Sequence, residues 1–87
     1  MHVTIHTAAL DGGEATITNS AAELVRMGFN PSVLPEVDRL KALAAAFISA
    51  CEAIRDKGGK GAREASIAIT DMQGASMFAV AAATADL

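Results

Sequence analysis

Polar and apolar residues alternate in two short segments near the start of the chain. The alternation covers residues 2–7 (HVTIHT) and 14–18 (EATIT), and Asp11-Gly12-Gly13 between them is a turn signal. This pattern is typical of two short strands joined as a hairpin. Ser20 and Glu23 then have the spacing of a capping box, at which a hydroxyl and a carboxylate satisfy the free amides of a helix start. We therefore expect a β-hairpin arm over residues 1–19 and a short helix over 20–27.

A connector over residues 28–34 separates this short helix from a long one. Gly28 can end the short helix, and Pro31 disfavours helical geometry in the preceding residue. Ser32 can cap the next helix, and Pro35 is tolerated in its first turn. Apolar residues then recur at alternating steps of three and four, which predicts a helix over 35–57. The positions of this seam are Val37, Leu40, Ala44, Phe47, Cys51 and Ile54, with Leu43 and Ile48 at its flanks.

Residues 58–61 (GGKG) break this helix, and a second long helix is expected over 62–85. Its seam would consist of Ala65, Ile69, Met72, Ser76, Ala79 and Ala83. Its other side is hardly more polar, with Ile67, Gly74, Met77, Phe78 and Val80. A helix that is apolar all round must be buried all round, and one partner helix covers only one side. The pattern therefore predicts an αα-hairpin whose copies cover one another.

Composition strengthens this expectation. The chain has 87 residues, room for one domain, and 52% of them are hydrophobic, but it contains three Phe and neither Trp nor Tyr. Much of the apolar fraction is alanine, which buries little area per residue, and a chain of this length is only marginally stable alone. We expect a single, mainly α domain that assembles as a homo-oligomer.

Charge and sequence signals exclude several classes of protein. The net charge of −3 argues against general affinity for long nucleic acids, which requires a basic surface. The uncharged stretch over 72–85 is shorter than a membrane span, and the N-terminus has no signal-peptide pattern. The single cysteine excludes an intramolecular disulfide. These features predict a cytoplasmic protein with no membrane role.

Signals for catalysis are weak. His2 and His6 are four residues apart on one face of a predicted strand, but two ligands make an incomplete metal site, and surface histidines are the favoured interpretation. Cys51 lies in a helix seam with no histidine near it in sequence, which favours a buried structural thiol over a nucleophile. No acid–base pair has convincing spacing. The sequence predicts neither an enzyme nor a cofactor or metal.

Signals for anion binding are stronger. Four of the seven basic residues fall in RDKGGKGAR, residues 55–63, ahead of a helix whose positive dipole end faces this loop. Copies of Arg63 brought together at an oligomer axis would form an anion site, although a simply solvated loop fits the spacing as well. Thr70 either bonds back to a helix carbonyl or lines an interface pocket.

The connector contains an aromatic residue and an amide that suit a nucleotide. The ring of Phe29 can stack on a base and Asn30 can read its edge, although a Phe29 that fills the hairpin core is the interpretation that the residues favour. Arg39 and Lys41 begin the first long helix and can reach the same region.

Four stretches of the chain together resemble one phage family. They are GFNPS, VDRLKALAAAFISACEAIRD, the basic glycine loop and AREASIAITDMQGASMFAVAAAT, within residues 28–85. The chain resembles the hairpin domain of the cyclic-nucleotide sponges, the anti-CBASS and anti-Thoeris proteins of bacteriophages. The N-terminal hairpin is more similar to the anti-Thoeris branch.

The resemblance implies a homohexamer without catalytic activity that sequesters cyclic di- or trinucleotides or cyclic ADP-ribose isomers in the host cytoplasm. It implies that Arg63 and Thr70 line a cyclic-oligonucleotide pocket at an oligomer axis. It assigns Phe29 and Asn30 to base or ribose contacts at a separate inter-subunit pocket, with Arg39 lending charge. Two alternatives stay open from the residues: a structural or protein-binding oligomer with no nucleotide ligand, and a subunit that depends on a different partner.

Overall fold

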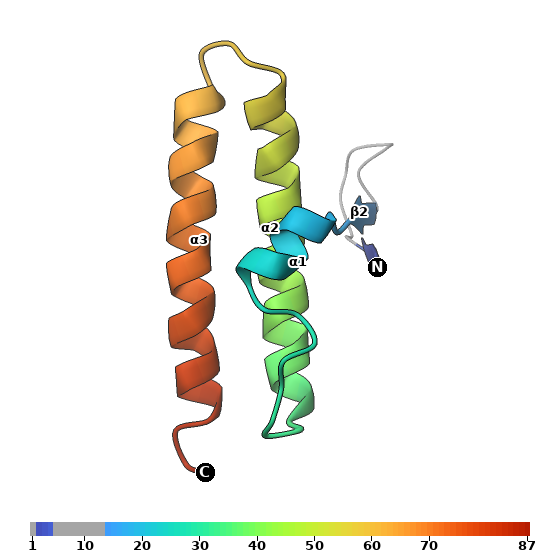
Figure 1. Cartoon of the computed structure of the whole chain (residues 1–87), viewed down its shortest axis with the longest axis vertical. Coiled ribbons are helices and arrows are strands. Elements are labelled where there is room, and N and C mark those ends of the chain that lie inside the picture. Colours follow the sequence, from blue (N-terminus) through green and yellow to red (C-terminus); the bar gives the residue numbers. More distant parts are fainter. Residues whose placement is uncertain (1, 5–13) are drawn as a thin grey trace.

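The structure is a computed structural model that describes residues 2–4 and 14–87. Within these residues the order of elements is β1 (His2–Thr4), β2 (Glu14–Thr16), α1 (Asn19–Leu24), α2 (Pro35–Asp56) and α3 (Ala62–Ala83). The two long helices run antiparallel and side by side, and α1 lies across the middle of α2 (Figure 1). The mainly helical fold with a short β-hairpin and two long helices, predicted from the pattern, is confirmed.

The two strands pair in antiparallel register, with Val3 opposite Ala15. Ile17, which follows β2, is buried in the core. The predicted turn at Asp11-Gly12-Gly13 lies outside the described residues, as do Ile5 and His6. The side chain of Ile17 therefore holds the segment between β2 and α1 against the core.

The short helix α1 differs from the prediction at both ends. Its N-cap is Thr18, whose hydroxyl accepts a hydrogen bond from the amide of Ala21 at 3.2 Å, so the prediction of a cap at Ser20 was wrong. The helix ends at Leu24 rather than at residue 27, because Arg26 adopts a left-handed conformation with φ of 57°. The amide of Met27 then donates to the carbonyl of Ala22 at 2.9 Å. This is the Schellman pattern, which satisfies the last carbonyls of a helix.

The connector is stabilised by its own side chains. The Ser32 hydroxyl donates to the side-chain oxygen of Asn30 at 2.7 Å, and the Asn30 amide donates to the carbonyl of Leu34 at 2.9 Å. The N-cap of α2 is Leu34, which provides no side-chain cap, and Pro35 occupies the first turn. The prediction that Ser32 caps α2 was therefore wrong, because its hydroxyl is used inside the connector.

The turn between the long helices depends on two glycines. Gly58 and Gly59 have φ angles of +73° and +84°, in the left-handed region that side chains disfavour. The amide of Gly58 donates to the carbonyl of Arg55 at 3.0 Å, which closes the end of α2. The helix break predicted at this glycine loop is confirmed.

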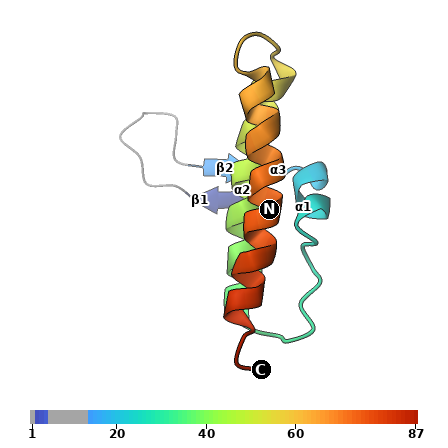
Figure 2. The same ribbon diagram turned by 90° about the vertical axis from the view of Figure 1, so that its left-hand side faces the viewer.

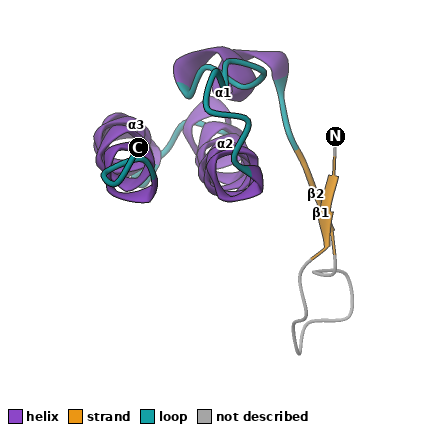
Figure 3. Ribbon diagram, turned by 90° about the horizontal axis from the view of Figure 1, so that it is seen from below, coloured by secondary structure: helices purple, strands orange, loops and turns teal. Residues whose placement is uncertain are grey.

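Helix α2 is the centre of the molecule. It contacts α3, α1 and both strands, which approach it from different sides (Figures 2 and 3). This arrangement rotates its buried face away from the predicted seam: Phe47 and Ile54 are 45% and 47% exposed, whereas the flanking Ile48 is fully buried. Phe47 and Ile54 of the predicted seam are therefore not buried within one chain, although Phe47 lines a groove between α2 and α3. The reason is that α1 and the strands cover a side of α2 that also carries buried polar residues.

The core is small and rich in alanine. Helix α3 faces α2 with the predicted seam, of which Ala65, Ile69 and Ser76 are buried. Among residues 2–4 and 14–87, only Ile48 and Val37 are large side chains with almost no exposure. An isoleucine contributes about 2–3 kcal/mol when buried and an alanine far less. The core of one chain is therefore modest.

Candidate functional site

Two adjoining hollows lie between the connector, α2 and α3. Their volumes are about 320 and 470 Å³, and both are lined by Phe29, Lys41 and Val80. We call the two together the connector cleft. The remaining lining residues come from the end of α1 and the turn after it, the connector, α2, α3 and the C-terminal residues after α3: Leu24, Val25, Arg26, Asn30, Pro31, Ser32, Val37, Gln73, Ser76, Met77, Thr84 and Leu87. The volumes of the two hollows are in the range of small-molecule binding sites.

Phe29 is an exposed aromatic residue at the rim of this cleft. Its exposed fraction is 66%, so the interpretation that it fills the hairpin core was wrong. The Nζ atom of Lys41 lies 5.5 Å from the ring centroid, a cation–π distance. The chain places Phe29 outside because the Arg26 turn directs the connector away from the core. An exposed ring beside a cation is suited to stacking on a flat ligand.

Asn30 has a different role from the one that its amide suggests. Its side chain makes the two hydrogen bonds within the connector described above, to Ser32 and Leu34. One N–H and one oxygen lone pair of the amide are left for a ligand. Asn30 therefore shapes the connector next to Phe29 and retains limited capacity to bind.

The cleft is positively charged in the part of the chain that the structure describes. Lys41 and Arg26 line it, and no aspartate or glutamate side chain does. The Arg26 Nη1 atom donates to the carbonyl of Glu23 at 2.6 Å, and the rest of its guanidinium remains exposed. Sequence reasoning missed Arg26 as a site residue. The sequence indicated only that Arg26 stands two residues before Gly28, near the end of a short helix.

Arg39 lies on the other side of α2. It lines a hollow of about 490 Å³ with Glu36, Leu40, Ala79, Ala82 and Ala83. This hollow shares Leu40 and Ala79 with an adjoining apolar groove of about 300 Å³ between α2 and α3. The groove is lined by Leu40, Leu43, Ala44, Phe47, Met72, Ala75, Ser76 and Ala79, and we call it the apolar groove. Within one chain, Phe29 and Asn30 come together, and Arg39 does not join them.

Arg63 and Thr70 lie near the opposite end of α3 from the connector cleft. They are seven residues apart, which places both on one face of the helix, and both are exposed. The Thr70 hydroxyl donates to the carbonyl of Ser66 at 3.3 Å, so it bonds back to its own helix. Within the described residues, Arg63 has neither a hydrogen bond nor an ion pair. The two residues form an open surface on α3 with an unpaired cation.

Other candidate chemistry has less support. Among residues 2–4 and 14–87, no three His, Cys, Asp or Glu side chains are grouped so that they could hold a metal ion. The side chains of His2 and His6 lie outside the described part. Cys51 is a free, buried thiol, as the seam position predicted. None of the helices in the described residues is long and apolar enough to cross a bilayer.

The comparisons with known proteins agree with this picture. A family model described as Acb2/Tad1, hairpin domain, matches residues 21–84. The chain belongs to the Acb2/Tad1 hairpin family. This is the family of anti-CBASS and anti-Thoeris sponges, so the resemblance stated from the sequence is confirmed. Acb2/Tad1 proteins sequester their ligands rather than transform them. Neither the curated proteins nor the solved structures gave a match.

The match to the Acb2/Tad1 hairpin covers the parts of the molecule that carry both candidate sites. Residues 21–84 include α1 from Ala21 onward, the connector, α2 and α3. The strands and Thr18 lie before it. The connector cleft, except for Leu87, and the Arg63 surface therefore lie within the matched residues, and the N-terminal hairpin lies before them.

Proposed function

We propose that this protein is a phage anti-defence sponge that binds cyclic nucleotides and removes them from solution without degrading them. The observation that carries the proposal is the connector cleft, in which an exposed aromatic ring lies beside two cations within the family domain. A cyclic nucleotide combines flat bases with phosphate charges, so this pair of features matches both parts of it. Cyclic di- or trinucleotides and cyclic ADP-ribose isomers are the ligand classes that we expect.

The second part of the proposal is that the ligand sites are completed where copies meet. The apolar groove between α2 and α3 carries Leu43 and Phe47, which are 52% and 45% exposed. Exposed apolar side chains that line a continuous groove are typical of an interaction surface. A second copy seated there would lie next to Arg39. In this arrangement Arg39 lends its charge to a connector cleft of a neighbouring copy.

The third part concerns the Arg63 surface. Symmetry would bring several copies of Arg63 and Thr70 to one axis, and the positive end of α3 adds to the attraction for an anion. We propose that this surface forms the cyclic-oligonucleotide site and that the assembly is a homohexamer. An overall charge of −3 does not oppose this, because the cations are concentrated at the sites.

Native mass spectrometry with a mixed panel of cyclic nucleotides tests the proposal. The expected spectrum is a hexamer with bound ligand of defined mass. Heating the complex should release the ligand chemically intact. Release of a linear or cleaved product would instead indicate an enzyme, and a bare oligomer with every ligand in the panel would favour a structural role.

Point variants locate the two sites. Phe29→Ala should weaken the binding of one class of ligand by roughly ten-fold or more, which is the contribution of one stacking contact. Val33→Ala is the matched control, since Val33 is also an exposed apolar residue of the connector and does not line the cleft. Arg63→Ala should weaken the other class, and Lys57→Gln removes a charge from the same loop as its control. If all four variants bind every ligand equally, both site assignments are wrong.

A further inference from the structure

Lys41 is a buried cation with an unusual set of partners. Its exposed fraction is 6%, and no carboxylate in the described part of the chain lies within ion-pair distance of it. A lysine is almost never buried to this degree unless its charge is compensated. The compensation here comes from main-chain carbonyls, because Nζ donates to the carbonyl of Arg26 at 2.8 Å and to the carbonyl of Phe29.

Two of the three N–H donors of the Lys41 ammonium group are used within the chain, and one remains. Two N–H groups bind the two carbonyls, and the charge lies 5.5 Å from the centroid of the Phe29 ring. A lysine has three donors and no acceptor, so little capacity is left for a phosphate oxygen. Arg26 differs in this respect, because one of its five N–H groups is used within the chain and the others are free.

Both carbonyls belong to the turn that presents Phe29. Arg26 has the left-handed backbone conformation, and its carbonyl also accepts a hydrogen bond from the amide of Phe29 at 3.1 Å. A residue other than glycine is strained in this conformation by about 1 kcal/mol, so the turn requires support from its surroundings. Lys41 provides this support from the second turn of the long helix α2. Its contacts fix the start and the end of the turn.

From these contacts we propose that Lys41 is a positioning residue for the nucleotide site: it holds the turn 26–29 and the Phe29 ring in place and does not contact the ligand. The proposal rests on the proposed function and assigns the anion contact in this cleft to Arg26. The alternative is a Lys41 that leaves the turn and binds a phosphate directly.

Hydrogen exchange of the free protein tests the clamp without any ligand. In Lys41→Met the stem of the side chain is kept and the ammonium is removed. The amides of Phe29 and Met27 are expected to exchange about ten-fold faster or more, whereas the amides of α3 should be unchanged. Lys41→Arg is the second variant in case the methionine variant fails to fold, and the larger guanidinium should also loosen the turn. Unchanged exchange at Phe29 in a folded variant would overturn the proposal.

A double-variant cycle with a bound nucleotide tests the role in binding. The dissociation constant of the best ligand of the panel is measured for Lys41→Met, for Phe29→Ala and for the pair. A positioning residue acts through the ring, so Lys41→Met should cost about as much as Phe29→Ala and nothing further in the pair. Arg26→Gln should weaken nucleotide binding by the same factor in the Lys41→Met variant, in the Phe29→Ala variant and in the wild-type protein. Additive losses for Lys41 and Phe29 would overturn the proposal and show a direct phosphate contact.

An uncharged probe separates the two roles again. The nucleoside that corresponds to the ligand has the base and no phosphate, and its weaker binding is measured by titration. Lys41→Met should reduce the affinity for nucleoside and cyclic nucleotide by the same factor, and Arg26→Gln should affect only the cyclic nucleotide. Loss confined to the phosphate-bearing ligand in Lys41→Met would contradict positioning. If the wild-type protein binds no nucleotide at all, the proposed function fails, and the exchange experiment still decides whether Lys41 holds the turn.

Discussion

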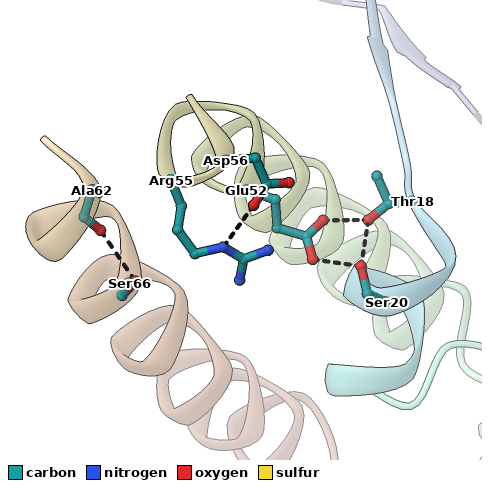
Figure 4. Close-up of polar contacts among 7 residues, drawn as sticks. All are labelled: Thr18, Ser20, Glu52, Arg55, Asp56, Ala62 and Ser66. Atoms are coloured by element: carbon teal, nitrogen blue, oxygen red, sulfur yellow. Dashed lines mark hydrogen bonds and ion pairs between the residues drawn. The ribbon is translucent and has the colours of Figure 1, made fainter. Parts of the chain in front are cut away.

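Replacing Thr18 or Ser20 tests how firmly the N-terminal segment is held to the long hairpin. The carboxylate of Glu52, a residue only 6% exposed on α2, accepts hydrogen bonds from the hydroxyls of Thr18 and Ser20, each at 2.5 Å (Figure 4). Thr18 also caps α1, and its amide donates to the hydroxyl of Ser49 at 3.0 Å. One carboxylate of α2 therefore binds both the N-cap and the first turn of α1.

The two hydroxyls are expected to contribute different amounts of stability. A hydrogen bond to a charged group contributes about 1.5–3 kcal/mol, and we take the lower value because Thr18 and Ser20 are exposed enough for water to replace part of the contact. Ser20→Ala should therefore reduce the free energy of unfolding by about 1.5 kcal/mol. Thr18→Val loses the same contact and a helix cap of about 1 kcal/mol, a total of about 2.5 kcal/mol.

Thermal unfolding measured by circular dichroism gives both values. For a chain of this size, roughly 4–8 °C of melting temperature corresponds to 1 kcal/mol, so Thr18→Val should melt lower than Ser20→Ala by a further 4–8 °C. All variants are compared at one chain concentration, because assembly makes the melting temperature depend on concentration. Ser66→Ala is the control. Its hydroxyl bonds only to the carbonyl of Ala62 in its own helix, so its loss should change stability by less than about 0.5 kcal/mol.

The relative stability losses of the two variants show whether Thr18 caps α1 and whether Glu52 holds the N-terminal segment. Equal losses for Thr18→Val and Ser20→Ala would show that the Thr18 hydroxyl does not cap α1 in solution. Losses below about 0.5 kcal/mol for both would show that Glu52 faces water and that the N-terminal segment is not fixed through it.

Three further predictions concern the hairpin. Leu43→Glu places a charge in the apolar groove and should shift sedimentation towards smaller species; an unchanged sedimentation coefficient would exclude the groove as the contact between copies. Gly58→Ala should lower stability by about 1 kcal/mol in chemical denaturation, because its φ is +73° although nothing lies within 4 Å of an added methyl group. Gly74→Ala removes a helix penalty of similar size and meets no neighbour within one chain. If another copy packs closely there, assembly measured by native mass spectrometry should weaken, and a strengthened assembly would show that this face of α3 is free.

The long helices were predictable because their signals are local. The steps of three and four, Pro35 in the first turn and the glycines at 58 and 59 depend only on neighbours in sequence. Which face of α2 is buried depends on tertiary contacts with α1 and the strands. The spacing of apolar residues could not reveal this face, because Lys41 and Glu52 are buried on it and both are charged residue types. One signal was available: these two polar residues share a helix face with Val37 and Ile48.

The candidate sites were predictable only in part. Phe29 and Asn30 stand next to each other in the connector, so their proximity required no structure. Arg26 could be identified as a site residue only from the structure, in which its left-handed backbone ends α1. The sequence had indicated Gly28 as the end of this helix. The separation of Arg39 from the connector follows from its position on a different face of α2 from Lys41, and that separation depends on where α3 packs.

The position of the two candidate regions on α3 has a consequence for how such a protein changes over generations. Val80 of the connector cleft and Arg63 are separated by 17 residues of one helix, or about 25 Å. Substitutions at that distance affect each other little. Under the proposed function, selection can therefore alter the range of signals recognised at one end of the helix while preserving recognition at the other, and a phage lineage can follow a change in its host's messenger without losing the protection that it already had.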